Sequence, residues 1–241
     1  MDDPALPQRR PFLSARWERL CLVTWAIDPD LLTPHLPAGL TLDTIDGNAF
    51  ISLVAFDFLD TRVLGISWPG YRNFPEINLR FYVRHGTQRG VVFLREYVPK
   101  HLISWIARTI YNEPYTAAPM TSTWTETLTT STLQHTLRVG KRDHHLTVTL
   151  ENTRSTPAED STEHFFKEHS FGYGQTRRNA LLSYQVWHPI WQTMPVQSHE
   201  LDWDFSLTYG HKWAFLNHTQ PSHVTFAVGS QIHVYPHQTP T

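Results

Sequence analysis

The chain has 241 residues, of which 40% are hydrophobic and 17% are charged, and its formal net charge is -2. This apolar content is enough for a sizeable core and excludes an intrinsically disordered chain. Its 20 Lys and Arg residues are scattered, so the sequence lacks the basic patch that a nucleic-acid-binding protein needs.

Cysteine content and hydropathy restrict the class of protein further. Cys21 is the only cysteine, which excludes an intrachain disulfide and a thiolate metal cluster. No apolar run approaches the ~18 residues of a transmembrane helix, and the polar start of the chain lacks the features of a secretory signal. We therefore expect a cytoplasmic protein without a nucleic-acid or membrane partner. We expect it to fold as one domain over residues 1–241, with residues 1–12 as a flexible N-terminal extension.

A short helix is the first predicted element. Asp28 is a suitable N-cap, and Pro29 fits the first helical position. We expect this helix to end before Pro37 and Gly39, which cannot continue regular helical hydrogen bonding at low cost.

A β-hairpin is predicted next, with strands over residues 40–45 and 49–59. The pair Asp46-Gly47 between them tolerates the positive φ angles of a tight turn. The second strand is apolar on both faces, so we expect it to be central in its sheet.

Residues 76–84 alternate strictly between polar and apolar side chains, which predicts a strand. The apolar face consists of Ile77, Leu79, Phe81 and Val83. The polar face consists of Glu76, Asn78, Arg80, Tyr82 and Arg84. On pattern alone the polar face is expected to meet water, whereas in a closed barrel it would line a polar lumen.

The rest of the chain continues the β-rich pattern. An amphipathic helix is predicted over residues 101–112, with Arg108 pointing away from its apolar stripe. The other predicted elements are a strand at 91–98, antiparallel strands within 121–151 around a turn at 140–143, a loop at 156–161, a short helix at 159–169, and closing strands within 181–196 and 222–235.

The histidines do not have the spacing of a metal site. On a helix His164 and His169 would point ~140° apart, and His144 and His145 face opposite sides of a strand. The glycine motifs that bind phosphate or dinucleotides and the serine-hydrolase elbow are absent from the sequence. We therefore predict neither a metal nor a cofactor.

Several motifs resemble the YqjF-like family of uncharacterised bacterial proteins, and the resemblance runs from about Trp17 to Tyr235. They are residues 36–43 (LPAGLTLD), 74–83 (FPEINLRFYV), 168–173 (EHSFGY) and 184–191 (YQVWHPIW), together with Ala107-Arg108, Tyr111 and Pro114-Tyr115. That family is similar to acetoacetate decarboxylase. The resemblance implies a closed, cone-shaped, antiparallel-rich β-barrel with a few short flanking helices and an internal pocket. Composition and periodicity alone predict an α+β chain that is mostly β.

The resemblance also raises the question of the catalytic lysine. Acetoacetate decarboxylases carry a Gly-Arg-Glu-x-x-Gly-Phe-Pro-Lys-Lys stretch, whose first lysine forms a Schiff base with the substrate. In the matching stretch, 107–116, the two lysine positions are occupied by Tyr115 and Thr116. A phenol cannot form an imine, and we expect all four lysines of the chain to lie in or next to polar turns or helix surfaces. The decarboxylase mechanism is therefore not expected here.

The residues that remain as candidates for a polar pocket are Glu76, Arg80, Arg108, Tyr115, Glu168, His169 and His188. The favoured hypothesis is that they bind a small organic carboxylate, with Arg80 or Arg108 as its anchor. A second hypothesis is an enzyme in which Glu76, Tyr115 or His188 performs acid and base steps such as enolisation, hydration or hydrolysis.

Two further alternatives stay open. The same polar residues would also serve as an internal ion-pair network that fixes loops onto the barrel. A third function class is a non-catalytic interaction protein, in which an aromatic rim including Trp187 and Trp191 docks a partner. A homo-oligomer is compatible with each of these hypotheses.

Overall fold

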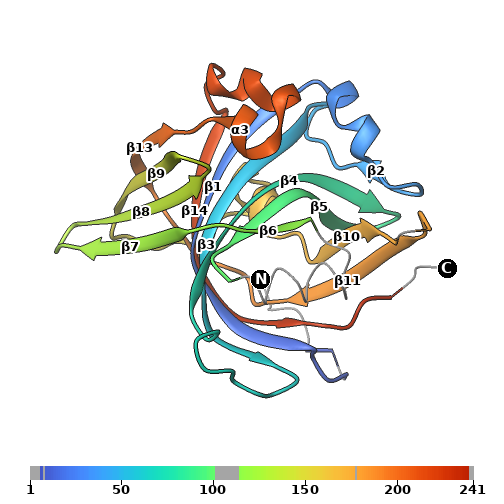
Figure 1. The fold of residues 1–241 in the computed structure, drawn as a ribbon, viewed down its shortest axis with the longest axis horizontal. Helices are drawn as coiled ribbons and strands as arrows, with labels where there is room; N and C mark the ends of the chain where they lie inside the picture. Colours follow the sequence, from blue (N-terminus) through green and yellow to red (C-terminus); the bar gives the residue numbers. More distant parts are fainter. Residues whose placement is uncertain (1–5, 8, 101–113, 177, 239–241) are drawn as a thin grey trace.

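Long strands make up most of the structure, and its helices are few and short (Figure 1). The computed structural model describes residues 6–7, 9–100, 114–176 and 178–238. The larger sheet contains β1 (Leu13–Ile27), β2 (Thr41–Leu42), β3 (Ala49–Val63), β4 (Phe74–His85), β5 (Gln88–Val98), β6 (Tyr115–Ala117), β10 (Phe171–Gln175), β11 (Leu181–Trp187), β12 (Thr193–Met194) and β14 (His223–Val234). The smaller sheet contains β7 (Met120–Glu126), β8 (Thr130–Val139), β9 (Arg142–Glu151) and β13 (Val196–Asp202). The helical elements are η1 (Pro29–Leu31), η2 (Thr33–His35), α2 (Thr162–Lys167), α3 (Phe205–Tyr209) and η3 (His211–Asn217).

The pairings of the larger sheet close into a ring. Following the hydrogen bonds, the order is β4-β3-β1-β14-β11-β10-β5, and β5 pairs back with β4. All these pairings are antiparallel except that of β10 with β5, which is parallel along Phe171–Tyr173. The chain therefore encloses an inner face without leaving these strands an open edge along the ring.

The smaller sheet covers part of the outer face of this ring (Figure 1). One apolar cluster joins Leu133, Leu146 and Val148 of the smaller sheet to Leu53 and Leu79 of the larger one. Strands of the larger sheet that are covered by the smaller sheet on one face are thus buried on both faces. This explains why β3 is apolar on both faces, as the sequence predicted for a central strand.

A second apolar cluster fills much of the inside of the ring. Its members Leu22, Val54, Tyr82 and Ala227 alternate along their strands with residues of the first cluster, so they lie on the face opposite the smaller sheet, which is the inner face. Helix α2 adds Phe165 and Phe166, whose rings pack against each other and against Tyr82. Ser161 caps this helix by accepting a hydrogen bond from the His164 amide.

Two local predictions near the N-terminus were right only in part. The short helix starts as predicted, with Asp28 as its N-cap and Pro29 at the first helical position, and it ends before Pro37. It consists of two successive 3-10 turns, η1 and η2, because Pro34 near the start of the second turn lacks the amide that a continuous helix needs. The predicted hairpin is wrong in its partner, since β2 pairs with β4 and not with β3. Both edges of β3 are already occupied by β1 and β4. Only the turn at Asp46-Gly47 remains, with φ angles of 50° and 79°.

Most of the polar face of β4 is turned away from water, contrary to the pattern, although Arg84 near its end is exposed. Glu76, Asn78 and Tyr82 are 3%, 1% and 1% exposed, and the apolar face is buried as well. The alternation predicted the strand correctly, but it cannot reveal that the sheet curves round to cover its polar side.

Most of the later elements agree with the predictions. Strands β5, β7, β8, β9, β11 and β14 lie within or close to the predicted ranges, the turn at Gly140 has a positive φ of 61°, and the predicted helix at 159–169 is shortened to α2. The predicted helix at 101–112, including Arg108, lies outside the described residues. The sequence patterns did not predict β1, β6, β10, β13, α3 and η3. No helix among the described residues is long and apolar enough to cross a membrane.

Candidate functional site

Four polar side chains meet on the inner face of β4, β5 and β6. The strand register places Asn78 opposite Glu96 and Glu96 opposite Tyr115, so these three residues share one row across the sheet. Glu76 lies two residues before Asn78 and therefore on the same face. Glu96 and Tyr115 are distant in sequence from the β4 residues, and strand pairing brings them to this place.

Glu76 is the residue of this group that links the others by hydrogen bonds. Its Oε1 accepts a hydrogen bond from Asn78 Nδ2 at 3.0 Å, and its Oε2 accepts one from the Tyr115 hydroxyl at 3.0 Å. Burial raises the pKa of the Glu76 carboxyl to about 7, although hydrogen bonds to Asn78, Tyr115 and Glu96 and the charge of Arg80 oppose this. The arrangement can therefore donate or accept a proton near pH 7.

Arg80 follows on the same strand and carries a positive charge into the interior. Its Nη2 donates to the Phe166 carbonyl at 3.3 Å, and its guanidinium carbon lies 5.8 Å from the centre of the Tyr82 ring. Within the described part of the chain, no carboxylate oxygen lies within 4.0 Å of this guanidinium, and its buried Nε has no hydrogen-bond partner. Its charge nevertheless influences both Glu76 and His188. Arg80 is thus a cation with capacity left to bind an anion.

The end of α2 holds a buried lysine, contrary to the prediction that every lysine lies at a surface or polar turn. The Lys167 side chain has no exposed area, and its Nζ forms an ion pair with Glu168 Oε1. Glu168 Oε1 also accepts a hydrogen bond from the Trp191 backbone amide at 3.3 Å. The neighbouring carboxylate explains how this helix can tolerate an inward-pointing ammonium group.

His188 lies beside the same carboxylate. Its Nδ1 is 3.9 Å from Glu168 Oε2 and donates a hydrogen bond to the Pro189 carbonyl at 2.9 Å. Its ring stacks on that of Trp191 with a centroid distance of 3.9 Å, and burial lowers its pKa. Trp191 is only 4% exposed, and its indole donates to Ser230. Trp191 therefore belongs to the core, and the hypothesis that it forms an exposed docking rim is wrong.

His169 belongs to a different cluster, centred on Asp43. The buried Asp43 carboxylate receives hydrogen bonds from Arg84 and Arg89, both at 2.6 Å, and from His169 Nε2 at 3.0 Å. Burial opposes the ionisation of Asp43, but the hydrogen bonds from His169, Arg89 and Arg84 hold its pKa well below the usual range. Burial also lowers the pKa of His169 to about 4, so the neutral ring donates its Nε2 proton. This cluster joins distant segments and fits the structural ion-pair alternative.

The predicted residues thus fall into three places. Glu76, Arg80 and Tyr115 are grouped on the inner face, Glu168 and His188 lie near the end of α2 on the other side of Arg80, and His169 lies at Asp43. Arg108 is outside the described residues. The sequence reading missed Glu96, Lys167 and Asp43 as members of these clusters. Strand register would have identified Glu96, but the burial of Lys167 left no signal in the sequence.

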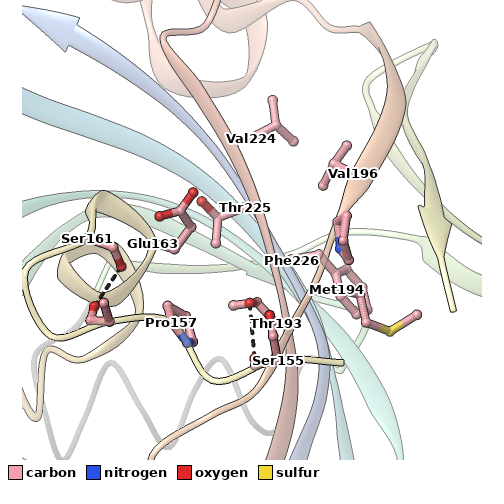
Figure 2. A pocket seen from close by; sticks show the side chains of 12 residues that line it. Ser155, Pro157, Ser161, Glu163, Thr193, Met194, Val196, Val224, Thr225 and Phe226 are labelled. Atoms are coloured by element: carbon pink, nitrogen blue, oxygen red, sulfur yellow. Dashed lines mark hydrogen bonds between the residues drawn. The ribbon is translucent and has the colours of Figure 1, made fainter. Parts of the chain in front are cut away.

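A separate pocket of about 380 Å³ opens on the other side of α2 (Figure 2). Its wall combines apolar side chains with Glu163, Thr193 and Thr225, and Glu163 and Thr225 point toward one another across it. None of the six described candidate residues lines this pocket. In the described ranges no group of three or more His, Cys, Asp or Glu side chains is arranged to hold a metal ion.

Comparison with known proteins identifies relatives but no activity. The model of a family described as an uncharacterised conserved protein, DUF2071, matches residues 14–231. The uncharacterised protein YqjF of Bacillus subtilis (strain 168) is 35% identical over 107 residues, and this match spans 44% of the chain and 44% of the length of that relative.

Solved structures with the same fold are more distant in sequence. An acetoacetate decarboxylase-like enzyme from Sphingomonas wittichii RW1 has a TM-score of 0.63 and 16% identity, covering 97% of this chain and 95% of that one. The enduracididine biosynthesis enzyme MppR, complexed with pyruvate, has a TM-score of 0.62 and 14% identity, covering 94% and 89%. Acetoacetate decarboxylase from Legionella pneumophila subsp. pneumophila str. Philadelphia 1 has a TM-score of 0.61 and 16% identity, covering 98% and 87%. At this identity the similarity establishes the acetoacetate decarboxylase-like fold alone.

Proposed function

Because the chain belongs to the DUF2071 family of uncharacterised conserved proteins and has an acetoacetate decarboxylase-like fold, we propose that it binds a small organic carboxylate inside its ring of strands. Arg80 is the proposed anchor. The proposal includes the closed, cone-shaped barrel that the family resemblance implies, with the ligand between the Glu76 row and the end of α2.

The observation that carries this proposal is the state of Arg80. Taking a guanidinium out of water is costly unless an anion compensates it, and its planar fork matches a carboxylate. In the described residues Arg80 donates to the Phe166 carbonyl and interacts with the Tyr82 hydroxyl, but it has no ion pair within 4.0 Å. A bound carboxylate would supply the missing negative charge. The pyruvate in the MppR complex is a ligand of this chemical class in a protein of the same fold.

A second candidate function is acid–base catalysis on the bound carboxylate. The Glu76 carboxyl, with a pKa raised to about 7 by burial, is suited to move a proton at neutral pH, and Tyr115 is hydrogen-bonded to it. Such chemistry would enolise, hydrate or hydrolyse a ligand without an imine intermediate. Tyr115 occupies the position that corresponds to the Schiff-base lysine, which favours this route over decarboxylation.

Isothermal titration calorimetry tests the anchor, with pyruvate and acetoacetate as probes. The wild-type protein is expected to bind at least one of them, and Arg80→Gln is expected to weaken binding by about tenfold or more, since a hydrogen-bonded charge pair contributes ~1.5–3 kcal/mol. Arg154→Gln is the matched control, because Arg154 is exposed. It should bind like the wild type.

The Arg80 variant also needs a folding control, because its site is internal. Circular dichroism and thermal unfolding should show a cooperative transition for Arg80→Gln. A folded Arg80→Gln protein that binds both probes as tightly as the wild type would contradict the proposal, and so would a wild-type protein that binds neither.

A further inference from the structure

The connection between β3 and β4 carries an exposed apolar tip, defined here as Leu64, Ile66 and Trp68. These side chains are 70%, 57% and 55% exposed. In Figure 1 this connection is the loop that projects from the bottom of the molecule, beyond the ends of the neighbouring strands. Single exposed apolar residues are common, but three large ones on one projecting loop indicate a contact surface.

The loop holds these side chains outward by its own hydrogen bonds. Val63 and Ile66 exchange backbone hydrogen bonds at 3.0 Å, and the Tyr71 amide donates to the Trp68 carbonyl at 3.1 Å. At its base the Thr61 amide donates to the Arg72 carbonyl at 2.9 Å. The tip is therefore built as a fixed projection and is not a strand end that folds back onto the core.

Leu64 and Gly65 form the turn of this loop. Both have positive φ angles, 52° and 82°, as a two-residue turn closed by the Val63 and Ile66 hydrogen bonds requires. The turn leaves the Leu64 side chain 70% exposed at the end of the projection.

The charge around the tip is positive. Residues 61–73 contain Arg62 and Arg72 and neither Asp nor Glu. Arg72 is paired with Asp60 at 2.8 Å, whereas exposed Arg62 has no carboxylate within 4.0 Å in the described residues. Lys100 Nζ lies 5.9 Å from the centre of the Tyr71 ring, which places a further cation at this loop.

We propose that this tip docks on an anionic lipid surface, with Leu64, Ile66 and Trp68 entering the interfacial region and Arg62 and Lys100 facing lipid phosphates. Tryptophan and aliphatic side chains flanked by basic residues are favoured at this boundary. A second copy of the chain is a poorer occupant. Three partly exposed side chains fall well short of the ~800 Å² per partner of a stable interface, and two copies of the tip would bring like charges together. The proposal revises the expectation, drawn from the absence of spanning segments, that membranes are not partners.

Flotation of the full chain with lipid vesicles tests the proposal. Phosphatidylcholine vesicles with about 30% phosphatidylglycerol should retain the wild-type protein, and pure phosphatidylcholine vesicles should not. The variant Leu64→Asn, Ile66→Thr, Trp68→Ser should bind at least about tenfold more weakly. Asparagine is chosen because it tolerates the left-handed conformation, so this variant is expected to fold. Arg62→Gln should weaken binding about fivefold, and about 0.5 M salt should do the same or more.

Leu128→Ser is the matched control, since Leu128 is 100% exposed at the turn between β7 and β8 and has no basic neighbour in sequence. It should float like the wild type. Equal flotation of the triple variant, or none of the wild type, would overturn the proposal. Sedimentation velocity supplies the remaining outcome: self-association that the triple variant abolishes would identify the tip as an interface between copies and would also overturn it.

Discussion

A carboxyl group with a near-neutral pKa in the interior makes Glu76 the most informative single residue of the site. Its burial is nearly complete, and its hydrogen bonds come from Asn78, Tyr115 and Glu96. These partners favour the ionised form, but the loss of hydration outweighs them. Burying this carboxyl therefore lowers the stability of the folded protein, but it leaves a group that can exchange a proton near neutral pH.

The pKa of Glu76 makes a prediction about stability. Its value is raised from an ordinary 4.5 to about 7, so in this range the folded protein holds a proton that the unfolded chain has released. The stabilisation is fully present below pH 4.5 and is lost as the pH rises through 7, by about 3 kcal/mol in total. Glu76→Gln should remove this dependence. Urea unfolding at pH 5 and pH 7.5 should show the variant gaining stability relative to the wild type as the pH rises, and a constant difference between them would contradict the shifted pKa.

Which residues form the site could be predicted only in part. Glu76, Arg80 and Tyr115 are identifiable from the sequence because they lie in alternating or family-like motifs. Glu96 and Lys167 are not, since an acidic residue in a strand and a lysine in a short helix are usually solvated. Their burial follows from contacts between segments far apart in the chain.

Helix α2 shows at the scale of an element how position changes the chemistry of a side chain. It has only six residues, yet Phe165 and Phe166 anchor it inside the ring and Lys167 is buried with them. A buried amine raises the question of imine formation, because an uncharged lysine in such a place is a nucleophile. Here Lys167 Nζ is already engaged in an ion pair with Glu168.

This ion pair predicts that α2 does not supply a Schiff-base lysine. Treatment of the wild-type protein with pyruvate and borohydride should leave its mass unchanged, as judged by intact-protein mass spectrometry. Peptide mapping would locate any adduct. A reduced adduct on Lys167 would show that the ammonium group is released from Glu168, and imine chemistry would then replace the acid–base route proposed for Glu76 and Tyr115.

Strands were easier to predict than their partners. The alternation in β4 and the apolar run of β3 identify both elements, because a strand leaves a period of two in the sequence. The prediction that β2 and β3 form a hairpin was wrong, because the turn residues Asp46-Gly47 do not indicate that β4 already pairs with this edge of β3. Register, and with it the row containing Asn78, Glu96 and Tyr115, depends on the whole sheet.

At the scale of the whole molecule, the interface between the two sheets contains a buried histidine without hydrogen bonds in the described residues. His135 of β8 is fully buried, and neither ring nitrogen has a hydrogen-bond partner among the residues that the structure describes. Burial, together with the charge of Arg19, lowers its pKa from 6.5 to about 3. The unfolded chain therefore takes up a proton below pH 6.5 that the folded protein excludes. Stability is fully present above pH 6.5 and falls as the pH drops toward 3.

His135→Leu should remove both the buried polar atoms and this acid sensitivity. We expect it to raise the free energy of unfolding at pH 7 by about 1–3 kcal/mol and to lessen the loss between pH 7 and pH 5. Urea titrations at the two pH values measure both effects. His145→Leu is the control, because His145 points to the opposite face and is hydrogen-bonded to Thr136 at 3.2 Å. Destabilisation by His135→Leu would show that the ring has a partner after all.

The closed ring itself could not be derived from composition or periodicity, which predict only a mostly β chain. Its assignment from sequence rested on family resemblance, and the fold is borne out by structures of 14% to 16% identity.

The strands of the ring differ in how many of their residues are paired with their neighbours. Among the described residues, hairpin β10–β11 pairs with β5 along Phe171–Tyr173 and with β14 along Val186–Trp187, helped by a bridge between Ser183 and Gln238. The neighbouring strand β1 is paired along nearly its whole length on both sides. Detaching this hairpin from β5 and β14 thus breaks fewer cross-strand hydrogen bonds than detaching β1 would. A solute that reaches the interior is therefore expected to enter where β10 and β11 separate from the ring, while the other strands stay paired.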